Sequence, residues 1–146
     1  MEELLKLVKK VAEEAEVFAV SRSETDAVFE TNRLKQVVTR ETSGRALRLI
    51  KGGRIGFSAS NKVDGTKELV AMALEMAPFG AEAKFQFPEL ESYSKVDVYD
   101  PKVENVTEEQ MVELGQSLID KVRKHTPELV CQGGVSKNTI SVEILN

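Results

Sequence analysis

The first residues of the chain place their apolar side chains at helical spacing. One narrow stripe runs along residues 2–15 and consists of Leu4, Leu5, Val8, Val11, Ala12 and Ala15. Charged side chains of both signs occupy the other positions, which is not typical of a helix that lies on a membrane. The pattern therefore predicts an amphipathic helix over residues 2–15 that packs on a sheet.

From residue 17 onward the apolar and polar positions alternate, which indicates strands. Five such segments follow one another, at residues 17–24, 26–32, 33–42, 45–51 and 54–60. The joints Asn32-Arg33, Ser43-Gly44 and Gly52-Gly53 have the residue types of two-residue hairpin loops. Because joints this short connect only antiparallel neighbours, the pattern predicts a five-stranded antiparallel meander.

Helical spacing returns over residues 64–79, which form the second predicted helix. Asp64 or Thr66 is the expected N-cap, and Pro78 with Gly80 is the expected end. The predicted buried face comprises Leu69, Val70, Ala73, Leu74 and Ala77. We expect this helix to pack on the sheet.

A third helix begins at a well-marked N-terminus. Thr107 and Gln110 have the spacing of a capping box, and Val106 precedes the cap, where we expect it to contact Met111. The predicted buried stripe comprises Met111, Leu114, Leu118, Ile119 and Val122. The basic residues among 121–125 suit the negative end of the helix dipole.

The last part of the chain alternates again and predicts two strands, residues 128–136 and 139–146, with a turn at residues 136–138. Residues 81–105 show no period and predict an irregular connection. We therefore expect one α+β domain over residues 1–146, with an N-terminal helix, a five-stranded antiparallel meander, two further helices packed on the sheet and a C-terminal strand pair. Because Asn146 ends the chain within or directly after a strand, we also expect a fragment of a longer protein.

Composition narrows the classes of function. The chain has 146 residues with 41% hydrophobic and 30% charged residues, an ordinary balance for a globular domain. A net charge of −4 and an aromatic content of 5% do not favour nucleic-acid binding, which relies on basic surfaces and stacking. The N-terminus has no signal-peptide pattern, and no apolar run has the length of a membrane span. We expect a cytoplasmic protein that binds no membrane.

The residues that usually carry catalysis are few. His125, the one histidine, is interpreted as part of the helix end, and Cys131, the one cysteine, as an inert core thiol. Asp97, Asp100 and Glu104 could suggest a cation site, but their spacing fits no calcium loop and favours a solvated linker. On its residues alone, the chain shows no catalytic or metal-binding motif.

The stretch "KGGRIGFSAS" at residues 51–60 raises a question of phosphate binding. A phosphate loop of the G-x-x-x-x-G-K-[ST] type needs a spacing that is absent here, so Gly52-Gly53 is interpreted as a hairpin turn.

The strand after this turn has one nearly bare face, formed by Arg54, Gly56, Ser58 and Ser60. A smooth strand face often marks the close approach of another backbone. That backbone could belong to the protein's own helix, to a partner or to a peptide. If a peptide or partner binds here, a bulky residue at Ser58 should leave the fold intact and impair function.

The order of several motifs resembles the N-terminal domain of the TldD/PmbA family, once described as modulators of DNA gyrase. The motifs are "EVFAVSRS", "VFETNRLKQV", "SGRALRLIKGGRIGFSAS", "ALEMAPFG" and "CQGGVSKNTISVEILN", and they cover nearly the whole chain. The stretch "GFSAS" followed by Asp64 is more similar to the PmbA branch, also called TldE, than to the TldD branch. In the family the last strand leads into an Asn-Ser-x-Gly step, of which Asn146 would be the first residue.

The resemblance implies a role in proteolysis. TldD and PmbA subunits form a cytoplasmic complex that cleaves peptides, and the TldD-type subunit holds zinc through an H-E-x-x-x-H helix and a distant cysteine. None of those ligands lies in the N-terminal domain, so no cofactor is expected in this chain, and zinc is implied only for the TldD-type partner subunit. The implied partners are a TldD-type subunit or a second copy, and an extended peptide substrate.

Two hypotheses of function follow. In the first, the chain is a non-catalytic domain of a peptidase complex, which helps to form the substrate chamber and the subunit contacts. In the second, it is a free-standing binding module for nucleic acid or a protein partner, in line with the gyrase description. A purely structural oligomerisation domain is a variant of the first. The acidic balance of the chain favours the first hypothesis over nucleic-acid binding.

Overall fold

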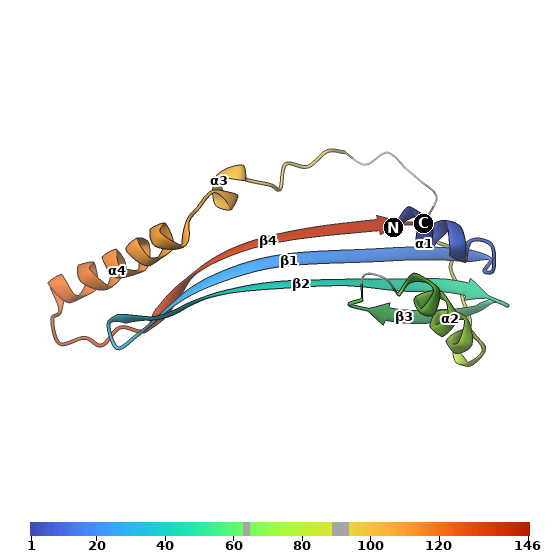
Figure 1. Cartoon of the computed structure of the whole chain (residues 1–146), viewed down its shortest axis with the longest axis horizontal. Helices are drawn as coiled ribbons and strands as arrows, with labels where there is room; N and C mark the ends of the chain where they lie inside the picture. The colour runs from blue at the N-terminus through green and yellow to red at the C-terminus, as the bar shows by residue number, and fades with distance from the viewer. Residues whose placement is uncertain (63–64, 89–93) are drawn as a thin grey trace. The chain divides into compact units, whose positions relative to one another are not determined.

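The computed structural model describes residues 1–62, 65–88 and 94–146 (Figure 1). Within these residues the strands are β1 (Glu14–Glu30), β2 (Arg33–Lys51), β3 (Arg54–Ser60) and β4 (Gly133–Leu145). The helices are α1 (Glu2–Val8), α2 (Thr66–Met76), α3 (Pro101–Glu104) and α4 (Glu108–His125), with a 3-10 turn η1 (Ala77–Phe79). The strands form an antiparallel sheet in the order β3-β2-β1-β4, on which helices pack. The predicted α+β class is confirmed.

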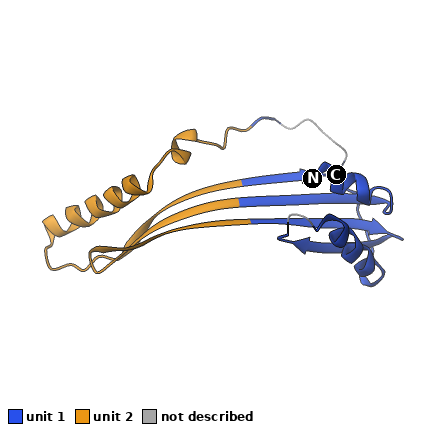
Figure 2. Cartoon of the chain, in the orientation of Figure 1, with its two compact units in different colours: residues 1–21, 43–95, 141–146 blue, residues 22–42, 96–140 orange. Residues whose placement is uncertain are grey.

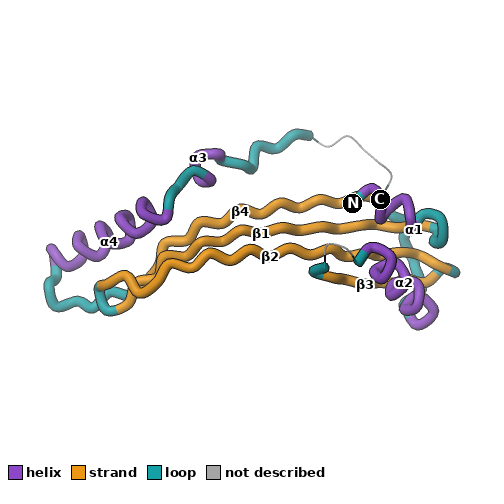
Figure 3. Tube along the Cα trace, viewed as in Figure 1, coloured by secondary structure: helices purple, strands orange, loops and turns teal. Residues whose placement is uncertain are grey.

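The predicted number of strands is wrong, because several predicted joints lie inside continuous strands (Figure 3). β1 continues through residue 25, β2 continues through Ser43-Gly44, and β4 continues through residues 136–138. A type I′ hairpin loop needs positive φ angles at both central residues. Among the described residues such angles occur only at Thr31, Asn32, Gly52 and Gly53. The five-stranded meander and the C-terminal strand pair therefore merge into a sheet of four longer strands.

The Gly52-Gly53 turn is confirmed. Its two glycines have φ angles of 57° and 67°, and Lys51 faces Arg54 directly across the turn. The carboxylate of Glu13 accepts the N–H groups of Gly52 and Gly53 at 2.7 and 3.3 Å. A side chain from the residue directly before β1 therefore accepts both backbone donors of the turn.

The turn between β1 and β2 lies at Thr31-Asn32, one residue before the predicted Asn32-Arg33. Both residues have positive φ angles, 52° and 65°. The Oδ1 atom of Asn32 accepts the N–H of Cys131 at 2.7 Å, and the N–H of Asn32 donates to the Cys131 carbonyl at 3.1 Å. This pair of bonds fixes the turn to the segment that leads into β4.

The first helix ends earlier than predicted. α1 stops at Val8, and the next residues turn so that the N–H of Glu13 donates to the Ile50 carbonyl at 2.9 Å. Leu4 and Val8 are buried as predicted, whereas Ala15 is buried as part of β1 rather than of the helix. The apolar spacing of residues 2–15 therefore combines the end of a short helix with the start of a strand.

The second helix agrees better with the prediction. Leu69, Val70, Ala73 and Ala77 are buried, and Leu74 is half-buried. The N-cap is Gly65, so Thr66 is the first helical residue and not the cap, and Asp64 lies outside the described residues. The α-helix continues as the 3-10 turn η1, which ends at Gly80, as predicted.

The chain divides into two compact units, which Figure 2 shows in different colours. Unit 1 comprises residues 1–21, 43–95 and 141–146, and unit 2 comprises residues 22–42 and 96–140. The core of unit 1 is formed by α1, α2 and the ends of β1 and β2, and its buried residues are Leu4, Val8, Ala15, Val17, Leu47, Leu49, Leu69, Val70, Ala73 and Ala77.

In unit 1, the segment after η1 contacts β2 and β3 through backbone hydrogen bonds and aromatic side chains. The N–H of Ile55 donates to the Ala81 carbonyl at 2.9 Å, next to an antiparallel bridge between Arg54 and Glu82. Further along, the guanidinium of Arg48 lies 5.4 Å and 5.0 Å from the ring centres of Phe85 and Phe87. These cation–π contacts hold a segment that has no helix or strand of its own.

Unit 2 has a smaller core. Its buried residues are Ala27, Phe29, Met111 and Ile119, with Val37, Val106, Val112, Cys131 and Val135 packed around them. The predicted capping box of α4 is confirmed, because the N–H of Gln110 donates to Thr107 Oγ1 at 3.2 Å and the N–H of Thr107 donates to Gln110 Oε1 at 3.0 Å. In the connection before it, the described residues 81–88 and 94–105 are mostly irregular, as predicted, apart from the short α3.

Candidate functional site

The bare face of β3 lies against the protein's own helix at its two central positions. A Cβ atom on Gly56 would lie 2.1 Å from the carbonyl oxygen of Ala73 in α2, so no side chain fits there. Ser58 is buried, and its hydroxyl donates to the Leu69 carbonyl at 2.7 Å. Of the alternatives left open by the sequence, close approach of the protein's own backbone is confirmed at Gly56 and Ser58.

Burial of Ser58 also changes the expectation for a bulky substitution. A larger side chain at this position would have to displace the turn of α2 that contains Leu69, so we expect it to destabilise the packing of α2. The effect of a bulky residue at Ser58 on function stays a prediction.

The two outer residues of the bare face remain accessible. Arg54 is exposed and donates from Nη1 to the Gly80 carbonyl at 2.8 Å. Ser60 is half-buried, and its Oγ atom accepts the N–H of Lys62 at 3.0 Å. A contact of the Arg54, Gly56, Ser58 and Ser60 face with a peptide or partner stays a prediction, and only Arg54 and Ser60 are reachable without movement of α2.

Ser60 borders a polar pocket of about 240 Å³ in unit 1. Its lining is dominated by small and charged side chains, namely Ser21, Ser43, Arg45, Ser60, Asn61, Lys62, Ser141 and Glu143, together with Ala19, Val20 and Gly44. Arg45 donates to the Lys62 carbonyl at 2.8 Å, which fixes one wall. The hydroxyl, amide and charged groups of this lining can form hydrogen bonds to a bound group.

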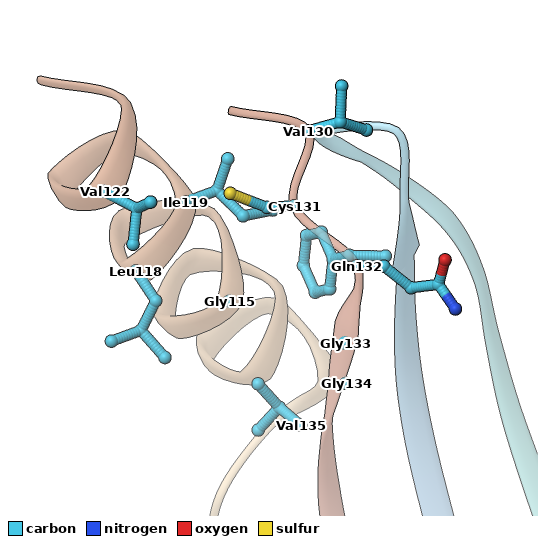
Figure 4. A pocket seen from close by; sticks show the side chains of 11 residues that line it. Gly115, Leu118, Ile119, Val122, Val130, Cys131, Gln132, Gly133, Gly134 and Val135 are labelled. Carbon is cyan, nitrogen blue, oxygen red and sulfur yellow. The ribbon is translucent and has the colours of Figure 1, made fainter. Parts of the chain in front are cut away.

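A larger and more apolar pocket of about 430 Å³ lies in unit 2, between α4 and the segment that enters β4 (Figure 4). Leu118, Ile119 and Val122 line it from the helix, while Val130, Cys131 and the following residues to Val135 line it from the other side. Phe29 of β1 and Gly115 of α4 complete the lining. Sequence reasoning missed this pocket.

Next to this pocket, α4 approaches β1 most closely at a glycine. A Cβ atom on Gly115 would lie 2.2 Å from Cε2 of Phe29, so the ring lies directly against the helix backbone. The predicted buried stripe of the helix is correct for Met111 and Ile119 and wrong for three of its members. Leu114, Leu118 and Val122 are 52%, 52% and 42% exposed. The helix packs on the sheet with the face that contains Gly115, and the pattern of apolar residues could not indicate this face.

The remaining candidate residues have structural roles. His125 is exposed at the end of α4, where its Nδ1 atom lies 2.9 Å from the hydroxyl of Thr126. Cys131 is half-buried in the apolar pocket of unit 2. Asp100 caps α3 by accepting the N–H of Lys102 at 2.9 Å.

In the same connection, Glu104 accepts a hydrogen bond from the hydroxyl of Tyr99. This hydrogen bond to the carboxylate raises the pKa of Tyr99 above its ordinary value. Among the residues that the structure describes, no three His, Cys, Asp or Glu side chains are grouped so that they could hold a metal ion.

In unit 2, neighbouring side chains shift the pKa of one carboxylate, Asp26. Asp26 accepts a hydrogen bond from Ser136 Oγ at 2.6 Å and pairs with Arg40 Nη1 at 2.9 Å. The hydrogen bond from Ser136, with a smaller contribution from Arg40, holds the pKa of Asp26 below its ordinary value of 3.8. This cluster ties β1 to both of its neighbouring strands.

Comparison with known protein families shows what this chain is similar to. Residues 15–77 match the model described as PmbA/TldA metallopeptidase domain 1. The predicted resemblance to the PmbA/TldD family is confirmed. The match covers β1 from Ala15 onward, β2, β3 and α2, including both turns and the bare face of β3.

Solved structures share the fold of this domain. TldE from Thermococcus kodakarensis superimposes with a TM-score of 0.83 at 22% identity, over 99% of this chain and 34% of that one. A candidate modulator of a DNA gyrase from Thermotoga maritima gives a TM-score of 0.76 at 12% identity, over 97% of this chain and 37% of that one. A corresponding protein from Bacteroides thetaiotaomicron gives 0.70 at 14% identity, over 98% and 40%.

The chain thus spans about a third of the length of these PmbA/TldD-type structures. No curated protein matches the sequence. Within the described residues, no helix is both long and apolar enough to span a membrane.

Proposed function

We propose that this chain is the non-catalytic N-terminal domain of a zinc-dependent peptidase complex of the TldD/PmbA type. In this role it helps to form the substrate chamber and the contacts between subunits, while a TldD-type subunit supplies the zinc and the catalytic groups. The observation that carries the proposal is the match of residues 15–77 to the first domain of a metallopeptidase family. The likeness of 99% of the chain to about a third of a TldE chain supports it.

Two surfaces of the chain suit contact with an extended peptide. Ser60 offers a polar group at one end of β3, where it borders a pocket of about 240 Å³, and Arg54 offers an exposed charge at the other end of the strand. In unit 2, the apolar pocket of about 430 Å³ has the size and lining for an apolar side chain. An extended peptide presents both kinds of group in alternation, which is the chemistry that these surfaces would recognise.

The proposal is tested by comparing the chain alone, a TldD-type subunit that carries H-E-x-x-x-H, and a mixture of the two. Zinc content is measured by elemental analysis, association by size-exclusion chromatography, and cleavage with an unfolded peptide. We expect no zinc and no cleavage with the chain alone, and a zinc-dependent peptidase complex in the mixture. Stoichiometric zinc or zinc-dependent cleavage by the chain alone would contradict the proposal.

A variant of the accessible face tests the peptide contact in the same assay. Arg54→Glu reverses an exposed charge on β3 and should lower cleavage by the mixture. Lys6→Glu reverses a charge in α1, whose side chain is 77% exposed, and serves as the matched control. Equal activity of the two variants would remove Arg54 from the peptide-binding surface.

A further inference from the structure

The strand β4 has one edge without a strand neighbour in the described part of the chain. The sheet order β3-β2-β1-β4 places it at the border, and it runs unbroken for 13 residues. The opposite border strand, β3, is covered at its start, where Ile55 and Gly53 bond to the segment 81–83 at 2.9 and 2.8 Å. A long uncovered edge presents unpaired backbone N–H and C=O groups, which favour pairing with another strand.

The side chains of β4 do not protect this edge. Ile140, Val142 and Ile144 form one row along the strand and are 54%, 54% and 57% exposed. Proteins usually shield an edge strand with proline, with several charges or with a bulge. β4 contains no proline and two charged residues, Lys137 and Glu143.

We propose that β4 pairs antiparallel with β4 of a second copy of this chain, about a two-fold axis at Ile140. This register places Lys137 of each copy opposite Glu143 of the other. Because these are the charged residues of the strand, the register is the one that matches opposite charges. It overlaps residues 135–145 of each copy, which is nearly the whole strand.

The other pairs of this register also match. On the face that carries the charges, Val135 lies opposite Leu145, and Thr139 lies opposite Ser141, so an apolar pair and a hydroxyl pair flank each ion pair. On the other face Ile140 meets its own counterpart at the axis, with Val142 on the diagonal. A two-fold axis repeats each pair, as an isologous interface requires.

The contacts of Lys137 within its own chain leave room for the ion pair. Its ammonium group lies 2.7 Å from the Val106 carbonyl and 3.4 Å from the Glu104 carbonyl. An ammonium group has three donors, so one is left for a carboxylate of the second copy. The backbone hydrogen bonds also permit the register. Along an edge strand, every second residue points its N–H and C=O groups outward, and in this register odd residues face odd ones and even residues face even ones. The outward-pointing groups of the two copies therefore meet.

This inference goes beyond the proposed function, because it concerns association between two copies of the chain and involves no peptide, zinc or TldD-type subunit. If the chain does not self-associate, the proposed peptidase role is unaffected. If the peptidase proposal fails, the proposed self-association is unaffected. The expected association is a property of the 146-residue chain itself.

The first test is sedimentation equilibrium of the wild-type chain and three charge variants. We expect a monomer–dimer equilibrium, weakened about tenfold or more by Lys137→Glu and by Glu143→Lys, because each variant places like charges opposite one another twice. The double variant Lys137→Glu with Glu143→Lys should restore the wild-type dissociation constant. The control exchanges an exposed pair of α1, Glu2→Lys with Lys6→Glu, and should leave the constant unchanged.

A second test keeps the inference falsifiable if a charge variant fails to fold. In a Cys131→Ser background, Ile140→Cys should form an interchain disulfide with oxidised glutathione, since the two copies of residue 140 face each other at the axis. The control Ile144→Cys should not, because residue 144 faces Ser136 of the second copy. A monomer at every concentration, single variants without effect, or equal crosslinking of the two cysteine variants would each overturn the inference.

Discussion

The two compact units use a glycine for the same purpose with different results. In unit 1 the glycine is on the strand, and the absence of a side chain at Gly56 lets the backbone of α2 lie against β3 at Ala73. In unit 2 the glycine is on the helix, and Gly115 lets the ring of Phe29 lie against α4. In unit 1 the closest contact between helix and strand is therefore backbone to backbone, whereas in unit 2 it is between the helix backbone and one aromatic ring.

This difference decides how much of each helix is covered. The face of α2 that meets β3 is buried along its length, and it belongs to a core of ten buried residues. The core of unit 2 has four, and Leu118 and Val122 of α4 border a pocket of about 430 Å³. The helix that contacts a strand backbone therefore belongs to the larger core, while the helix that contacts one ring borders an apolar pocket.

The largest effect is expected at Gly56. In Gly56→Leu the new side chain would collide with the Ala73 carbonyl, a backbone atom that can move only with the whole helix. We expect a loss of about 3 kcal/mol or more in the free energy of unfolding. Urea denaturation followed by circular dichroism measures it, and a loss no larger than that of an exposed substitution such as Ala59→Leu would contradict the backbone contact.

A smaller effect is expected at the corresponding glycine of unit 2. In Gly115→Ala the new methyl group meets the edge of the Phe29 ring, which can rotate or shift more easily than a backbone. We expect a loss of about 1–2 kcal/mol, within the usual range for overpacking. Gly115→Ala should cost less in a Phe29→Leu background than in the wild-type chain, and an equal cost in both backgrounds would show that the ring is not the obstacle.

The hydroxyl of Ser58 should contribute less than either glycine. Ser58→Ala removes the hydrogen bond to the Leu69 carbonyl but keeps the close packing of α2. We expect a loss of about 1 kcal/mol. The matched control is Ser60→Ala on the same face, where the side chain is half-buried, and thermal denaturation should rank the two variants in this order.

The smallest effect concerns the pH dependence of unit 2. Because the folded state holds the pKa of Asp26 below 3.8, the ionised carboxylate stabilises the fold above this pH, and the contribution is lost as the pH falls through the lower folded value. Asp26→Asn should therefore lose less stability between neutral and strongly acid pH than the wild-type chain does. Parallel urea titrations at the two pH values test this, and identical acid losses would contradict the assignment.

Sequence reasoning predicted features that depend on neighbouring residues. Positive φ angles favour glycine, so Gly52-Gly53 was recognisable as a turn, and the spacing of Thr107 and Gln110 was sufficient to place the start of α4. It failed at Ser43-Gly44, where the same residue types occur inside an extended strand. Small polar residues permit a turn without requiring one, and the pairing of β2 with β3 through Arg45 and Ser60 decides between the two.

The candidate site was only partly predictable for a related reason. The bare face of β3 could be read from Gly56 and Ser58, but which backbone lies against it depends on where α2 folds back. The pocket of unit 2 depends on contact between Gly115 and Phe29, which are far apart in the sequence. An apolar stripe predicts that one face of a helix is buried, and it cannot indicate that a glycine next to the stripe makes the closest contact.

We expect α2 of unit 1 to be held more firmly than α4 of unit 2, because the buried core of unit 1 is larger among the described residues. Amide hydrogen exchange of the isolated chain, followed by mass spectrometry, tests it most directly, because exchange reports the stability of each segment separately. We predict that β3 and α2 of unit 1 exchange more slowly than α4 of unit 2. Equal or slower exchange of α4 would contradict the claim and would show that the contact of Gly115 with Phe29 is sufficient to hold that helix.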